Sequence, residues 1–239
     1  MTLACLVALL AAALALGAAR GQQAVCPPPE FDAVKGLDVR KFATAPWFSQ
    51  AQMPLSFNPA DQFYCVRARY QLNDQDDLTA GIKVLFYANE GRVNGPVVST
   101  AKGSTHVEQS GNITDLEEPS KFDVLPTNLQ TIFRKTLLRF FFPDHWVVAV
   151  GPSKNRTLAY DWAIVSAGPP KTPGKAGCRT DISFLGLFQV HQGGLWLLTR
   201  KPVDPVGTSI MRNVAEAMGF DLTVLGDVQQ AECKYIGAP

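Results

Sequence analysis

Cysteine has the widest chemical range of the residue types in this chain, from nucleophilic catalysis to metal binding and disulfide formation. Cys5 lies in an apolar leader, and Cys26, Cys65, Cys178 and Cys233 follow it. An even number of cysteines in a secreted chain is typical of disulfides, and four cysteines allow three pairings. The sequence contains no Cys-x-x-Cys motif and its histidines lie far apart, so we expect no metal site and no cofactor.

The first 21 residues are typical of a secretory signal peptide. Residues 1–19 carry no charge, residues 3–16 are apolar, and small residues precede Arg20. The apolar run is too short to span a membrane comfortably. We therefore expect residues 1–21 to be removed, residues 22–239 to form one domain, and the protein to be secreted. The leader is poor in Ser and Arg, unlike a transit peptide.

Two sequons, at Asn112 and Asn155, predict glycosylation and fit the secretory pathway. Loss of Arg20 with the leader leaves 21 basic residues against 21 acidic ones. This balance makes nucleic acid and acidic membranes poor partners.

Residues 195–200, Leu-Trp-Leu-Leu-Thr-Arg, alternate in the manner of a β-strand. Trp196, Leu198 and Arg200 share one face. An arginine on an apolar inner face needs partners, because a buried unpaired guanidinium is very costly. A stacked aromatic ring and backbone carbonyls would supply them. From this stretch alone, an edge strand with a solvated arginine is the simpler interpretation.

The rest of the mature chain consists of apolar or alternating segments separated by turn residues. Strands are predicted from Pro46 to the residue before Pro54, and over 63–72, 81–88, 97–108, 121–125, 146–150, 160–166 and 195–199, with 136–142 as a further strand segment. Loops are predicted over 111–120 and 167–177, and an extension of a neighbouring strand over 184–190. The structure of 126–135 stays unassigned, with a short helix as one possibility.

A helical turn is predicted at 39–42, and a longer helix over 210–218, capped by Thr208 or Ser209 and ended by Gly219. Its apolar stripe comprises Ile210, Val214, Ala217 and Met218. About eight antiparallel strands followed by one helix predict an all-β domain, either a closed meander barrel or a sandwich. A barrel of this size can hold one small ligand.

Three patches of the chain resemble the lipocalin family. Phe42 with Ala45-Pro46-Trp47 is similar to the family's Gly-x-Trp motif, with Ala45 in place of glycine. Residues 157–162 resemble the turn before its seventh strand. Arg200 matches the arginine at the end of its eighth strand, which stacks on the motif's tryptophan and bonds to backbone carbonyls. The resemblance implies an eight-stranded antiparallel up-and-down β-barrel, closed by Trp47 and Arg200, with one C-terminal α-helix packed outside.

Within the family, the chain resembles the apolipoprotein D-like group and the related plant and bacterial lipocalins. The cysteines, Tyr70, the first sequon and residues 118–121 follow that group's pattern in order. Residues 160–170 are closer to plant chloroplastic lipocalins, which makes the thylakoid lumen an alternative location. The resemblance covers residues 26–235, with 126–135 and 167–177 as departures. It implies the disulfides Cys26–Cys178 and Cys65–Cys233.

The resemblance also implies a ligand site inside the barrel. If Arg200 points inward, Leu198 and Trp196 do too, with Trp196 higher in the cavity. Tyr70 and Trp196 match ligand-lining positions of the group, and Tyr70 could supply one orienting hydrogen bond. Four aromatic residues are further candidates that face either inward or outward under the helix: Phe86, Phe140, Phe142 and Trp146.

We therefore expect a carrier of a small hydrophobic ligand, of the fatty acid, sterol, retinoid or carotenoid class, and not an enzyme. A lipocalin-type isomerase or de-epoxidase is one alternative, but the implied disulfides leave no cysteine nucleophile. A stress-protective protein whose barrel is filled by its own side chains is the other. We expect a monomer or weak dimer, and peripheral membrane contact stays open.

Overall fold

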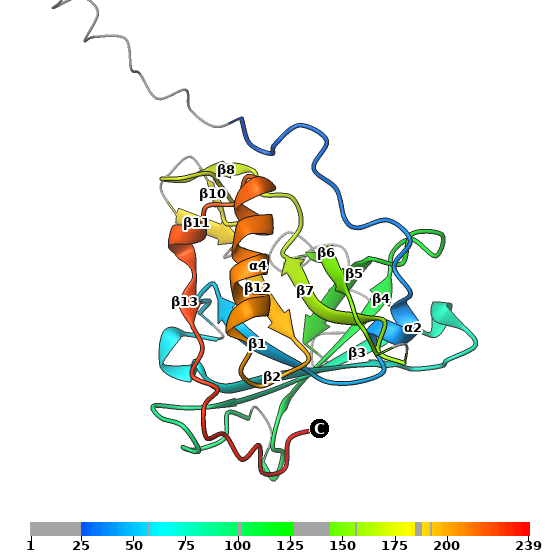
Figure 1. The fold of residues 1–239 in the computed structure, drawn as a ribbon, viewed down its shortest axis with the longest axis vertical. Coiled ribbons are helices and arrows are strands. Elements are labelled where there is room, and N and C mark those ends of the chain that lie inside the picture. Colours follow the sequence, from blue (N-terminus) through cyan, green and yellow to red (C-terminus); the bar gives the residue numbers. More distant parts are fainter. Residues whose placement is uncertain are drawn as a thin grey trace, which may run out of the picture.

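The computed structural model describes residues 25–56, 58–99, 102–126, 144–155, 157–184, 188–191 and 193–239. Eight antiparallel strands form the barrel: β1 (Trp47–Gln52), β2 (Tyr64–Leu72), β3 (Ile82–Asn89), β4 (Val107–Ile113), β5 (Lys121–Pro126), β6 (Asp144–Pro152), β7 (Tyr160–Ser166) and β12 (Leu195–Thr199). Each strand pairs with the next, and β12 pairs back onto β1 (Figure 1). The predicted closed eight-stranded barrel is confirmed.

Closure explains why both faces of the last strand are buried. All five residues of β12 are buried. Its inward residues line the barrel interior, whereas its outward residues lie under the helix α4 (Pro205–Ala217), which packs against β12 and β7 (Figure 1). The edge strand with a solvated arginine, suggested by residues 195–200 alone, is therefore wrong, because β12 has a neighbour on each side.

The fourth strand begins ten residues later than predicted. Val97 forms only an isolated bridge to Asn89, and Gly103 interrupts the segment with a positive φ of 81°. Pairing with β3 resumes at Val107 and runs through Gly111, so Asn112 lies in a strand and not in the predicted loop. A side chain at Gly111 would collide with the carbonyl oxygen of Asp123 on β5, which explains glycine here.

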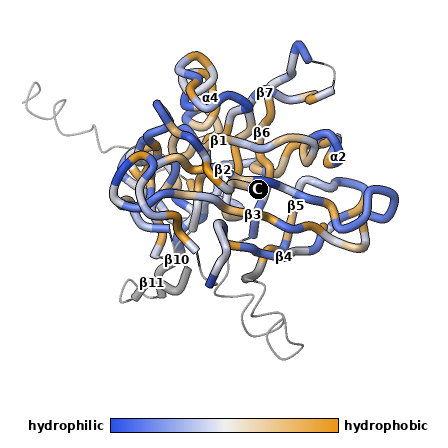
Figure 2. The backbone as a smooth tube through the Cα atoms, turned by 90° about the horizontal axis from the view of Figure 1, so that it is seen from below, coloured by the Kyte–Doolittle hydropathy of each residue, from blue (hydrophilic) through white to orange (hydrophobic). Residues whose placement is uncertain are grey.

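The helix α4 begins five residues earlier than predicted. Pro205 occupies its first turn, and the carboxylate of Asp204 accepts a hydrogen bond from the amide of Gly207, whereas the Thr208 hydroxyl donates to the Asp204 carbonyl. The buried face comprises Gly207, Met211 and Ala215. Ile210, expected on that face, is 43% exposed. Figure 2 shows both hydrophobic and hydrophilic stretches along α4, as a helix with one covered face requires.

Both predicted disulfides are confirmed. Cys26–Cys178 fastens the N-terminal segment, and Cys65–Cys233 fastens the C-terminal tail to β2, with Cα–Cα distances of 5.6 and 5.5 Å. These distances are ordinary for disulfides. Two such bonds fit an oxidising compartment.

The remaining elements are short. They comprise α2 (Val39–Phe42), the hairpin of β8 (Thr172–Pro173) with β9 (Cys178–Arg179), the hairpin of β10 (Ile182–Phe184) with β11 (Phe188–His191), and β13 (Gly226–Asp227) beside β1. Three short 3-10 helices are η1 (Ala60–Gln62), η2 (Leu78–Ala80) and η5 (Leu222–Val224). The α2 turn matches the prediction, whereas β10 and β11 pair with each other and extend no barrel strand. No helix in the described part of the chain is long and apolar enough to cross a membrane. The predicted leader (1–21) and residues 127–142 lie outside the described residues.

Candidate functional site

Strand register identifies the side chains that point into the barrel, because residues directly opposite each other in antiparallel strands share a face. Trp47 pairs with Ala68 and Ala68 with Phe86. Phe86 in turn pairs with Val107. On the other side of the barrel Phe122 pairs with His145, and Trp196 pairs with Gln52. These residues therefore form one inward face.

The floor of the barrel is built around Arg200 and Trp47. The guanidinium carbon of Arg200 lies 3.4 Å from the centroid of the Trp47 ring, and the Trp47 indole donates to the Phe42 carbonyl at 3.1 Å. Trp47 also contacts the Phe42 ring, with centroids 5.0 Å apart. All three residues come from segments that meet at the closed end of the barrel.

Backbone carbonyls surround the Arg200 guanidinium. It donates to the carbonyls of Lys41 and Phe42, at the end of α2, at 3.3 and 2.9 Å. It also donates to the carbonyls of Ala45, Pro46 and Tyr160. Burial lowers the Arg200 pKa to about 9, and repulsion by Arg69 adds to this effect.

Above the floor lies a layer of aromatic side chains centred on Tyr70 and His145. The Tyr70 hydroxyl and His145 Nε2 are joined by a hydrogen bond of 2.7 Å. The Tyr70 ring packs on Phe42 below, and both Tyr70 and His145 contact Phe122. This layer fills the lower half of the barrel with the protein's own side chains.

Burial controls protonation in this layer. Tyr70 is fully enclosed, and burial raises the pKa of its phenol, so the hydroxyl stays neutral. His145 is 5% exposed, and burial lowers its pKa to about 4. The imidazole is therefore neutral at physiological pH and shares the hydrogen bond with Tyr70 as an uncharged pair.

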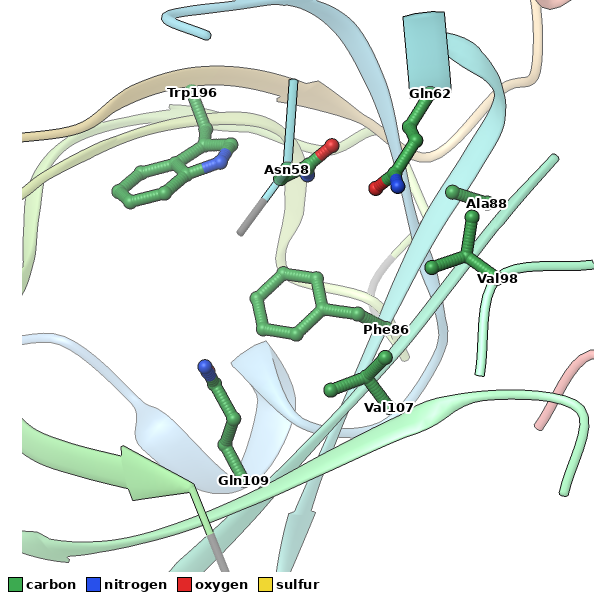
Figure 3. Close-up of a pocket in the computed structure, with 8 residues that line it drawn as sticks. All are labelled: Asn58, Gln62, Phe86, Ala88, Val98, Val107, Gln109 and Trp196. Carbon is green, nitrogen blue, oxygen red and sulfur yellow. The ribbon is translucent and has the colours of Figure 1, made fainter. Parts of the chain in front are cut away.

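A pocket opens above this layer, on the far side of Trp196. The Trp196 ring contacts the His145 ring with centroids 5.2 Å apart and lines the pocket with its remaining surface (Figure 3). The cavity between the lining side chains measures about 40 Å³ and is partly open to solvent. It is much smaller than most small-molecule sites, but it shares their apolar lining with a few polar groups. The lining residues are Asn58, Gln62, Phe86, Ala88, Val98, Val107, Gln109 and Trp196.

The predicted ligand residues separate into four groups. Trp196 and Phe86 line the pocket. Tyr70 lies in the aromatic layer beneath it, and Leu198 is buried on the inward face of β12 between Trp196 and the floor. Trp146 faces outward, because its neighbour His145 faces inward, and Lys121 Nζ lies 4.3 Å from the Trp146 ring centroid. Phe140 and Phe142 lie outside the described residues.

Sequence reasoning missed His145 and the carboxamides around the pocket. The wide spacing of the histidines argued only against a metal site, although alternation along 144–150 places His145 on the face opposite to Trp146. No group of three or more metal-ligating side chains occurs among the residues that the structure describes. Both sequon asparagines, Asn112 and Asn155, are exposed.

A scan of protein-family models finds no match, and a search of curated protein sequences finds none either. Solved structures do match. Insecticyanin from the tobacco hornworm Manduca sexta is 15% identical, with 88% of each chain covered and a TM-score of 0.50. The crustacyanin apoproteins C1 and C2 are each 10% identical, with 84% of each chain covered and a TM-score of 0.50. At these identities the likeness shows the fold, and that fold is the lipocalin fold.

Proposed function

We propose that this protein binds and carries, or sequesters, a small lipophilic molecule in the pocket above Trp196. The observation that carries the proposal is an apolar pocket inside a closed barrel, with two aromatic rings at its base and side. A ligand that hides about 300 Å² of apolar surface, which requires the cavity of about 40 Å³ to widen, gains roughly 7 kcal/mol before ordering costs. Before those costs are subtracted, this gain corresponds to a dissociation constant of about 10 μM.

The filled lower half of the barrel bears on the alternative of a protective protein without a ligand. Phe122, Tyr70 and His145 occupy the space over the floor, yet the filling stops at Trp196 and the pocket follows it. Interiors packed for stability leave few voids larger than a water molecule, and the cavity of about 40 Å³ above Trp196 exceeds that size. Binding is therefore the better supported of the two functions.

An enzyme of the cysteine-dependent lipocalin type is disfavoured by the disulfides. Cys26, Cys65, Cys178 and Cys233 are all bonded in pairs. A disulfide sulfur offers no thiolate for nucleophilic attack. Together with the apolipoprotein D-like sequence pattern and the predicted leader, this supports a secreted carrier.

Quenching of tryptophan fluorescence by lipophilic ligands tests the proposal, because Trp196 forms part of the pocket wall. We expect saturable quenching in the wild type that is much reduced in Trp196→Phe. Trp146→Phe is the matched control, since Trp146 lies outside the barrel, and it should leave the titration in place. Absence of saturable binding by any lipophile, checked by native mass spectrometry of the purified protein, would refute the proposed function.

A further inference from the structure

Gln52 is a polar side chain in an unusual position. It is 0% exposed, and within the described part of the chain neither its amide nitrogen nor its amide oxygen has a hydrogen-bond partner. A buried donor or acceptor without a partner costs about 1–3 kcal/mol. Native proteins satisfy most such groups, and an unsatisfied one calls for an explanation such as a functional role or a bound water or ion.

The register of the sheet places Gln52 beside the pocket. Gln52 on β1 is directly opposite Trp196 on β12, so both side chains are on the inward face. Trp196 forms part of the pocket wall. The carboxamide of Gln52 therefore lies inside the barrel beside Trp196, behind the residues that line the pocket, and a ligand reaches it by entering past the Trp196 ring.

Further carboxamides surround the same space. Asn58, Gln62 and Gln109 line the pocket, and the Asn58 side-chain oxygen is also buried without a partner among the described residues. Figure 3 shows the ends of Gln62 and Gln109 directed toward the space around the Phe86 ring. A carboxamide both donates and accepts hydrogen bonds and carries no charge.

The described lining of the pocket contains no charged side chain. Arg200, the inward-facing cation of the floor, is separated from the pocket by the aromatic layer and already donates to backbone carbonyls. An ionised carboxylate entering the pocket would lose its hydration without gaining an opposite charge, which is strongly unfavourable. A hydroxyl or carbonyl group loses less hydration and gains the carboxamides as partners.

From this arrangement, and resting on the proposed function, we propose that the ligand is an uncharged lipophile with a hydroxyl or carbonyl oxygen that hydrogen-bonds to Gln52. Ionised fatty acids are then poor ligands. The proposal also explains why a glutamine occupies a fully buried position: the described residues offer its amide no partner, and a ligand oxygen supplies one. Replacing it by leucine should therefore stabilise the free protein while weakening the complex.

A matched series of ligands tests this directly: 1-dodecanol, 2-dodecanone, dodecane and dodecanoate at pH 7.5, titrated by tryptophan quenching. We expect the alcohol and the ketone to bind at least tenfold more tightly than dodecanoate and about tenfold more tightly than dodecane. In Gln52→Leu the affinity for the alcohol and the ketone should fall about tenfold, dodecane should be unaffected, and the Tm should rise.

Gln50→Leu is the matched control, because Gln50 lies on the same strand but points outward and bonds to the carbonyl of Pro202. It should leave the ligand ranking unchanged. Gln109→Leu provides a second variant in the pocket. Because Gln109 is only half-buried, this substitution does not replace a fully buried side chain. Dodecanoate binding as tightly as the alcohol, or Gln52→Leu weakening all four ligands equally, would overturn the inference while leaving the binding function intact. Failure of all four ligands to bind would instead refute the binding function itself.

Discussion

His145 should make the stability of this protein depend on pH between about 4 and 6.5. Burial lowers the pKa of the folded-state imidazole to about 4, whereas the unfolded chain takes up the same proton near the ordinary value of 6.5. Between these values the unfolded state binds more protons, so its population rises as the pH falls. Stability is therefore complete above pH 6.5 and is lost as the pH decreases toward 4.

The magnitude follows from the two pKa values. At about 1.4 kcal/mol for each pH unit, the difference between 6.5 and about 4 lowers the free energy of unfolding by roughly 3 kcal/mol at pH 4. Asp32 and Asp221, whose pKa values are lowered in the folded state, also lose stabilising charge as the solution becomes acidic. These two carboxylates contribute equally to the wild type and to a variant at position 145. The difference in the free energy of unfolding between the two proteins therefore isolates the contribution of His145.

The variant for that measurement is His145→Gln, which keeps a hydrogen-bonding group near Tyr70 and cannot take up the proton. Urea unfolding followed by fluorescence at several values between pH 4 and 8 gives the free energy of unfolding of each protein. The variant should be less stable than wild type at pH 7 and should recover relative to it as the pH falls. His106→Gln, at the residue before β4, leaves the Tyr70–His145 pair intact and should keep the pH dependence that this pair produces. A wild-type-minus-variant difference that stays constant from pH 4 to 7 would refute the reasoning.

Three further predictions concern the floor, the disulfides and the aromatic layer. Arg200→Ala should lower the free energy of unfolding by roughly 2–4 kcal/mol, because it removes the stacking on Trp47 and the hydrogen bonds to part-buried carbonyls. Trp196→Ala should instead weaken ligand binding more than stability, and equal effects on melting and titration would contradict this division. The disulfide between Cys65 and Cys233 joins residues 168 apart in the sequence. In the loop-entropy model its removal should lower the free energy of unfolding by about 5 kcal/mol. Chemical denaturation of the variant with serine at both positions measures this loss. Tyr70→Phe should lower the free energy of unfolding by about 1–2 kcal/mol at pH 7, because it leaves a ring nitrogen of His145 without its partner. An unchanged denaturation midpoint would be inconsistent with the hydrogen bond between Tyr70 and His145.

Most strands could be predicted because their alternation is a local property of the sequence. The segments that became β1, β2, β3, β7 and β12 were each located to within about two residues. The fourth strand was misplaced because its polar residues carry little hydrophobic signal, and its position depends on pairing with β3 and close contact at Gly111. The start of α4 was missed because Thr208 and Ser209 looked like caps, while Asp204 followed by Pro205 is the stronger signal.

The interior of the site was harder to predict because it depends on long-range register. Trp196 could be assigned inward from its spacing to Arg200 within one strand. Gln52 follows a register shift between Ser49 and Ala51, so simple alternation counted from Trp47 would place it on the outer face. Only the pairing with Trp196 shows that it points inward. The hydrogen bond between Tyr70 and His145 likewise joins residues 75 apart in the sequence.

Two polar side chains inside the barrel, Tyr70 and Gln52, differ in their capacity to form a hydrogen bond with a ligand. Tyr70, which the sequence suggested as the orienting hydrogen-bond donor, already has His145 as its partner and lies beneath Trp196. Gln52 has no partner within the described chain and pairs with Trp196 across the sheet. A ligand oxygen therefore gains more by meeting Gln52 than by competing for Tyr70. On the ligand series above, Gln52→Leu should remove the preference for 1-dodecanol over dodecane, while Tyr70→Phe should leave it in place, and the reverse result would move the orienting contact back to Tyr70.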